Sequence, residues 1–183
     1  MELTYKSIDT ILTELKNPNS PGGPRLVPML PLVADPDHSD IREMLMPPAL
    51  LAELSKNDPK KTLEFNANVR AFLLRFVLGK IVDNDTYMKS WRADVFELRV
   101  QLKKKKESLR IFGGFAQPDT FVALRSKPRS FFGDKSDPAW DTIINETIAR
   151  WDALLPGYHR VIARPFSNCV TSKFFDVYDG GHE

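Results

Sequence analysis

The sequence predicts an α+β fold, in which helices pack a small antiparallel β-meander and a proline-rich N-terminal arm precedes it. Residues 94–126 read as three short strands, of which the first two alternate between their faces and the third is an apolar run. A pleated strand sends successive side chains to opposite faces. The two connections, residues 103–108 and 117–119, are too short for a parallel crossover, so the strands run antiparallel. Stretches with helical periodicity lie on both sides of the meander, and residues 17–37 contain six prolines.

Composition and length set the class of protein. The chain has 183 residues, of which 42% are hydrophobic and 27% charged, as in globular domains. We expect an N-terminal extension over residues 1–57, an α+β core over 58–155 and a tail over 156–183 that packs on the core. The formal net charge is only +2, so a nucleic-acid surface would have to come from local clustering of basic residues.

The same data bear on location and metal content. The single cysteine, Cys169, excludes an internal disulfide and fits a reducing cytoplasm, which is the location we expect. No apolar run is long enough to span a bilayer and the first residues do not read as a signal peptide, so no membrane partner is expected. The histidines are scattered without metal-ligand spacing, and we predict no metal site.

The N-terminal extension predicts short helices around the proline-rich arm. Residues 6–16 place apolar side chains at helical spacing, and Ser7 can cap that helix. The arm, residues 17–37, is interrupted by proline but rich in apolar residues, so it should lie extended on the surface of the domain. Ser39 begins a further short helix up to the prolines at 47–48, and another is expected over residues 49–56.

Two longer helices follow from a capping residue that precedes a proline. Asp58 before Pro59 and Asp137 before Pro138 give helices over residues 59–80 and 138–155, because proline in the first turn needs no N–H partner. Each has one apolar stripe, and we expect both on the apolar side of the sheet. The stripes consist of Phe65, Val69, Phe72, Leu73, Phe76 and Val77, and of Trp140, Ile143, Ile144, Thr147, Ile148, Trp151 and Leu154.

The meander itself has one apolar and one charged face. In the first strand Phe96 and Leu98 alternate with Glu97 and Arg99. The second strand, residues 109–116, sets Ile111 and Phe115 against Arg110, which should therefore point to the exposed face. The third strand covers residues 120–125.

A resemblance to a known family rests on this order of motifs. Phe96-Glu97-Leu98-Arg99, Leu109-Arg110-Ile111-Phe112-Gly113 and Phe121-Val122-Ala123-Leu124 occur in turn, followed by a basic loop and a C-terminal helix. The pattern resembles the RelE/ParE toxin superfamily, most of all the branch that contains HigB and its phage-encoded relatives. It covers about residues 62–155 and leaves out the first 60 residues and the tail.

The resemblance implies an mRNA endonuclease that cuts RNA on the ribosome and is inhibited by an antitoxin protein. Its chemistry is attack of a ribose 2′-hydroxyl on the adjacent phosphate, which needs positioning, proton transfer and cations but neither metal nor cofactor. Arg110 matches the family's strand arginine beside the phosphate. Arg125, Lys127 and Arg129 match the basic positions at and after the next strand, and these four form the expected catalytic set. Arg99 falls where some members carry a basic strand residue.

The sequence also departs from the family pattern. Glu97 stands where the ribosome-dependent nucleases often have lysine, and Phe131 and Phe132 stand where several members have a catalytic tyrosine. No histidine lies within the meander or the loop after it. The second functional hypothesis is therefore a non-catalytic interaction protein, of phage or mobile-element origin, that keeps the fold without the chemistry.

Four residues are candidates for RNA binding, and each has a structural alternative. Lys103 and Lys105 belong to a lysine run at a hairpin tip, which either contacts phosphates or is solvated charge. Arg99 either contacts RNA or pairs with a carboxylate such as Glu97. Phe131, beside Lys127, either stacks on a base or closes the sheet as a core residue.

Overall fold

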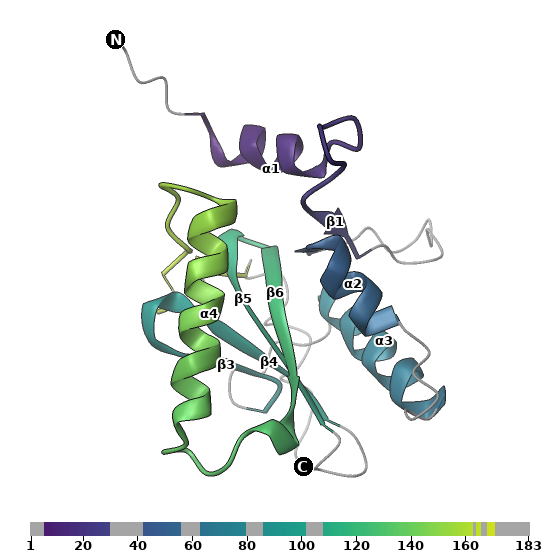
Figure 1. The fold of residues 1–183 in the computed structure, drawn as a ribbon, viewed down its shortest axis with the longest axis vertical. Coiled ribbons are helices and arrows are strands. Elements are labelled where there is room, and N and C mark those ends of the chain that lie inside the picture. Colours follow the sequence, from purple (N-terminus) through teal and green to yellow (C-terminus); the bar gives the residue numbers. More distant parts are fainter. Residues whose placement is uncertain are drawn as a thin grey trace, which may run out of the picture.

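The computed structural model describes residues 6–29, 42–55, 63–79, 86–101, 108–162, 164–165 and 168–170, with only the backbone of residues 63–66. Within these ranges the chain forms four α-helices against one six-stranded sheet (Figure 1). The predicted α+β class is therefore confirmed. The helices are α1 (Ile8–Lys16), α2 (Pro48–Ser55), α3 (Leu63–Val77) and α4 (Pro138–Leu154).

The sheet has the strand order β1-β2-β6-β5-β4-β3. Its strands are β1 (Val27–Pro28), β2 (Glu43–Met46), β3 (Met88–Ser90), β4 (Phe96–Val100), β5 (Leu109–Gln117) and β6 (Thr120–Pro128). The predicted meander is its centre, because β4, β5 and β6 are antiparallel neighbours. Two 3₁₀ turns, η1 (Arg92–Asp94) and η3 (Arg129–Phe131), follow β3 and β6.

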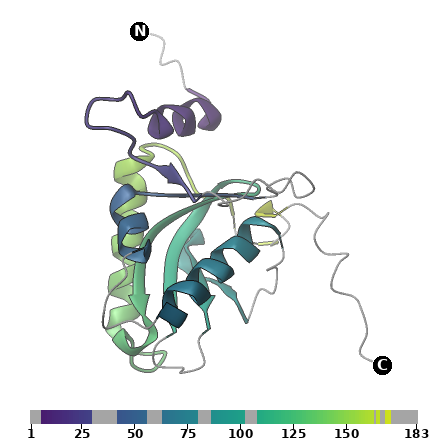
Figure 2. The ribbon, with the colours of Figure 1, turned by 90° about the vertical axis from the view of Figure 1, so that its right-hand side faces the viewer.

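The two long helices lie on opposite faces of the sheet, and the prediction that both share one face is wrong (Figure 2). Phe72 and Phe76 of α3 pack in one apolar cluster with Leu98 and Ile111. Trp140, Ile143, Ile144 and Trp151 of α4 pack on the other face, with Val95, Phe112, Val122 and Leu124. The second face carries enough apolar side chains to require its own covering layer.

The N-terminal extension contributes strands to the sheet. Helix α1 begins at the predicted cap, where Thr10 N donates to Ser7 Oγ at 3.2 Å, and α2 agrees with the predicted second short helix. The helix predicted from Ser39 is wrong over residues 43–46, which form β2 parallel to β6. Strand pairing wins because β2 satisfies the open edge of β6 and buries three of its four side chains.

The proline-rich arm is described only up to residue 29. Residues 17–23 turn, and β1 then pairs antiparallel with β2 at the edge of the sheet. Pro28 is tolerated there because an edge strand needs no donor on its outer side. The rest of the arm, residues 30–37, lies outside the described residues, as do residues 38–41.

Candidate nucleic-acid interface

Three basic side chains form one row across the meander. Arg99 of β4 lies opposite Arg110 of β5, and Arg110 lies opposite Lys127 of β6. Residues directly opposite one another on neighbouring strands share a face and have Cβ atoms about 4.5–5.5 Å apart. We call Arg99, Arg110 and Lys127 the cationic row. The sequence predicted Arg110 and Lys127 as members of one catalytic set and Arg99 as an RNA-binding residue, and the strand register brings the three together.

A buried carboxylate makes the row possible. Glu97 is 1% exposed, and its Oε1 lies 2.8 Å from Arg110 Nε and 3.2 Å from Arg99 Nε. Its Oε2 accepts a hydrogen bond of 3.0 Å from the indole Nε1 of Trp91. Two adjacent arginines repel each other, so a shared counter-charge beside them on the same face stabilises the arrangement. Arg99 was expected either to contact RNA or to pair with a carboxylate, and the structure shows the pair with Glu97. Arg110 and Lys127 stay beside Arg99 in the row.

Arg110 is less exposed than the strand alternation suggests. Its side chain is 14% exposed, and the expectation that it points to an open face is wrong because that face is also packed. Burial is the main cause that lowers the pKa of Arg110; Glu97 opposes the change, and the charges of Arg99 and Arg129 add to it. A second anion, such as a phosphate, would offset both the burial and this repulsion.

The loop after β6 adds a cation and an exposed ring. Lys127 Nζ lies 4.8 Å from the centroid of the Phe131 ring, which is 47% exposed. Arg129 donates to the carbonyls of Phe132 at 2.6 Å and Gly133 at 3.0 Å, which holds the loop in shape. No carboxylate of the described residues lies within ion-pair distance of Lys127 or Arg129. Phe131 is thus free to contact a ligand, whereas Phe132 is core.

A column of stacked rings supports the site from the side of α4. Phe132 stacks on Trp140 with centroids 3.9 Å apart, and Trp140 stacks on Trp91 at 5.1 Å. Lys89 Nζ caps the column 3.8 Å above Trp91. Sequence reasoning missed Trp91, Lys89 and the central role of Glu97. The alternation of Met88 and Lys89 is a strand signal, but three residues are too few for it to stand out.

The other predicted site residues lie apart from the row or outside the described chain. Arg125 is in register with Phe112 and forms an ion pair with Glu146 of α4. Burial, and next the charge of Arg150, lowers the pKa of Arg125. Its observed contact is a link between the sheet and α4. Lys103 and Lys105 lie outside the described residues.

The arrangement can bind and stabilise phosphoryl oxygens. For proton transfer the carboxylate in contact with the row is Glu97, which two arginines and an indole already engage. Burial raises the pKa of Cys169 to about 12, so its thiol stays protonated at neutral pH. No group of three or more His, Cys, Asp or Glu side chains among the described residues could hold a metal ion.

Comparisons of the chain with protein-family models, with curated proteins and with solved structures found no match. The resemblance to the RelE/ParE superfamily therefore stays a prediction. No described helix has the length and apolar character needed to cross a membrane. The basis for a function is the geometry of the cationic row and its neighbours.

Proposed function

We propose that this protein binds RNA, with the phosphate backbone on the cationic row of Arg99, Arg110 and Lys127. The observation that carries the proposal is the register, which holds three basic side chains side by side on adjacent strands. Glu97 pairs with Arg99 and Arg110, whereas no carboxylate of the described residues lies within ion-pair distance of Lys127. Because basic side chains bind phosphates by displacing condensed counterions, such a surface favours nucleic acid.

Phe131 makes the surface suit an RNA strand better than a simple anion. Its exposed ring lies beside Lys127, at the end of the row. Stacking of one base on an aromatic side chain contributes about 1–3 kcal/mol. A phosphate on the row and a base on Phe131 would together use both kinds of contact that single-stranded nucleic acid offers.

We further propose that the protein cleaves the RNA that it binds, because its sequence resembles the RelE/ParE toxin superfamily. In that reaction the 2′-hydroxyl oxygen forms a bond to phosphorus, the bond from phosphorus to the 5′-oxygen breaks, the 5′-oxygen takes up a proton from water to become a hydroxyl, and a 2′,3′-cyclic phosphate results. Arg110 and Lys127 would stabilise charge on the phosphoryl oxygens. Glu97 would have to accept the 2′-hydroxyl proton beside Arg110. An antitoxin protein with acidic side chains would be the matching inhibitor.

A second function is favoured by one observation. Glu97 is already engaged by Arg99, Arg110 and Trp91, as expected of a structural ion pair. In that case the protein keeps the sheet as an interaction scaffold and does not act on RNA.

The test is titration of the full chain with a labelled single-stranded RNA, followed by fluorescence anisotropy at several salt concentrations. Arg110→Ala and Lys127→Ala should each weaken binding and reduce the slope of log K against log salt by about 1. Arg75→Ala is the matched control, because Arg75 is an exposed arginine on α3, which covers the opposite face. The same samples on a denaturing gel show whether the RNA is cut.

The outcomes separate the functions. Loss of affinity in the row variants, with Arg75→Ala unchanged, supports RNA binding, and cut RNA that depends on Arg110 supports cleavage. If Arg110→Ala and Lys127→Ala fold and bind RNA as the parent does, the proposal is wrong and the interaction-protein function replaces it.

A further inference from the structure

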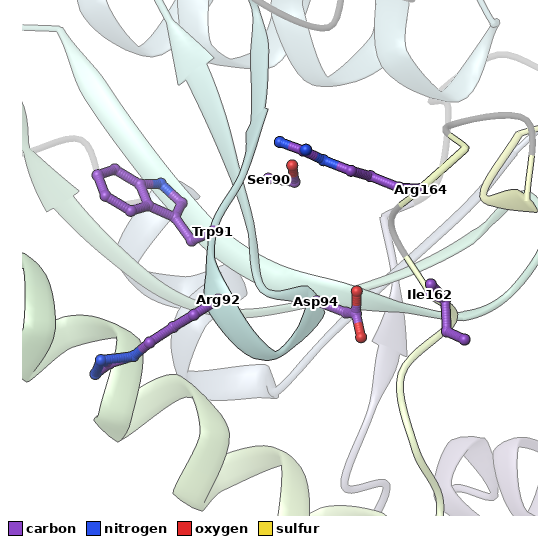
Figure 3. A pocket seen from close by; sticks show the side chains of 6 residues that line it. All are labelled: Ser90, Trp91, Arg92, Asp94, Ile162 and Arg164. Atoms are coloured by element: carbon purple, nitrogen blue, oxygen red, sulfur yellow. The ribbon is translucent and has the colours of Figure 1, made fainter.

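A pocket of about 550 Å³ lies beside the start of β4, and Figure 3 shows the side chains that line it. Two segments line it, the β3–η1 turn and the chain after α4. Its lining residues are Ser90, Trp91, Arg92, Asp94, Ile162 and Arg164. Ser90 pairs with Phe96 at one end of β4, whereas Arg99 of the row lies towards the other end. The pocket is therefore a separate feature of the sheet.

Two of the lining side chains are turned away from the pocket. Arg92 points to α4, where it contacts Asp141 at 3.0 Å and Asn145 at 2.8 Å (Figure 3). The ring of Trp91 also points outward, and its Nε1 is engaged by Glu97. Neither group is available to a molecule in the pocket.

Arg164 and Ser90 both line the pocket, and the Arg164 side chain extends towards Ser90 (Figure 3). Arg164 is exposed, and no carboxylate of the described residues lies within ion-pair distance of its guanidinium. A guanidinium offers a fork of N–H donors that matches carboxylate and phosphate oxygens, and a serine hydroxyl can donate to the same group. This end of the pocket has the chemistry of an oxyanion site.

The other end has acceptor and apolar character. Asp94 and Ile162 lie together there, and Ile162 is 64% exposed (Figure 3). Asp94 is presented by a strained turn, since Ala93 has φ 52° and Asp94 φ 55°. In this backbone region the Cβ of a non-glycine residue comes close to the following carbonyl oxygen. Arg160 Nε holds the turn by donating to Ala93 O at 2.7 Å. Strain of this kind occurs preferentially at ligand sites.

We propose that this pocket binds a small molecule with an oxyanion at one end and hydrogen-bond donors at the other. Arg164 and Ser90 would hold the carboxylate or phosphate, Asp94 would accept from hydroxyl or ammonium groups, and Ile162 would cover an apolar part. The volume lies within the range of about 300–1,000 Å³ that is usual for small-molecule sites. The proposal stands apart from RNA binding, since it uses none of the residues of the row.

Isothermal titration calorimetry of the full chain tests this site with three probes. Adenosine 5′-monophosphate carries a phosphate and hydroxyls, L-phenylalanine a carboxylate and an ammonium, and adenosine lacks the oxyanion. We expect one of the first two to bind in the millimolar range or tighter, and adenosine to bind at least about tenfold more weakly than the monophosphate if the phosphate is recognised. The stronger of the two oxyanion probes identifies the preferred group.

Variants locate the binding. Arg164→Gln should lower the affinity for the probe about tenfold, as expected for loss of a charge-assisted contact. Ser90→Ala should lower that affinity by a smaller factor. Arg92→Gln is the matched control, because that lining arginine points away and should leave affinity unchanged. The proposal is overturned if neither oxyanion probe binds, if binding survives both Arg164→Gln and Ser90→Ala, or if Arg110→Ala abolishes it instead.

Discussion

The indole of Trp91 donates to Glu97 Oε2 at 3.0 Å while the other oxygen of Glu97 lies 2.8 Å from Arg110 Nε. This pair connects the stacked rings of Trp91, Trp140 and Phe132 to the cationic row. The stacked rings and the cationic row are thus one structural unit. A substitution in the rings should therefore change the position of the arginines in the row.

Replacing Trp91 with phenylalanine tests that connection. Trp91→Phe keeps an aromatic ring for stacking on Trp140 but removes the donor to Glu97. A hydrogen bond to a charged group contributes about 1.5–3 kcal/mol, and Arg99 Nη2 still donates to the same oxygen at 3.4 Å. The free energy of unfolding should therefore fall by at most that amount in urea denaturation. RNA affinity should fall as well, since Glu97 would no longer hold Arg110 in one orientation. An unchanged unfolding free energy would show that the hydrogen bond is not significant.

Removing the charge of Glu97 should make the fold sensitive to salt. In Glu97→Gln, Arg99 and Arg110 stay side by side without their common counter-charge. We expect a loss of about 1–3 kcal/mol at low salt, because hydrogen bonds to charged groups are of this size. Partial recovery at high salt should follow, since ions screen the repulsion. Urea denaturation of parent and variant at two salt concentrations measures this, and equal losses at both would contradict the charge explanation.

A second buried charge, on the residue directly before β2, contacts the β5–β6 turn. The side chain of Arg42 is fully buried, its Nε lies 3.7 Å from Asp119 Oδ1, and its guanidinium lies 5.2 Å from the Phe76 ring centroid. Burial lowers the pKa of Arg42 to about 10, and Asp119 opposes that change. The carboxylate of Asp119 is therefore expected to stabilise the fold.

Asp119→Asn tests this pair with little change of shape, because asparagine tolerates the left-handed backbone at φ 60°. We expect the free energy of unfolding to fall by about 1–3 kcal/mol. This loss is smaller than that expected for a fully buried ion pair, because the Asp119 side chain is 17% exposed. Glu14→Gln is the control, since the Lys6–Glu14 pair is about half exposed and should contribute below about 1 kcal/mol. Equal effects of the two variants would contradict the prediction.

Gly113 and Gly114 form a matched pair in β5. A Cβ on Gly113 would lie 2.0 Å from the backbone oxygen of Val122, whereas one on Gly114 would meet the side chain of Arg160 at 2.6 Å. Backbone cannot move aside as a side chain can, so Gly113→Ala should cost about 1–3 kcal/mol or more and Gly114→Ala less. Thermal unfolding of the two variants measures the order, and a reversed order would contradict this account of the β5–β6 contact.

The raised pKa of the buried Cys169 thiol predicts a loss of stability at alkaline pH. Its folded pKa is raised from the ordinary 9.0 to about 12, first by burial and then by the charge of Asp94. Above pH 9.0 the unfolded chain therefore loses the thiol proton while the folded chain keeps it. The contribution of the protonated Cys169 thiol to the free energy of unfolding is fully present below pH 9.0. It is lost as the pH rises towards about 12. Urea denaturation on both sides of pH 9.0 should show a steeper decline for the parent than for Cys169→Ala.

Local patterns account for the elements that could be predicted. The alternation in residues 96–100 and 109–117, with short connections, is sufficient to specify an antiparallel meander. Ser7 and Asp137 cap α1 and α4 through side chains that accept from nearby backbone N–H groups, so the start of each helix is encoded within a few residues. The basic residues of the site were likewise visible, because they lie on these same strands.

Long-range pairing decided the rest. Residues 43–46 read as a helix locally, and only the open edge of β6 makes them a strand. Placement of α3 and α4 on opposite faces depends on how much apolar surface each face of the whole sheet presents. Glu97 alternates as a surface residue would, yet it is buried because Trp91, Arg99 and Arg110 converge on it from three segments. The sequence by itself determined which charges the meander carries; the tertiary structure decided which of them share a carboxylate, because ion pairs depend on distances that strand register sets.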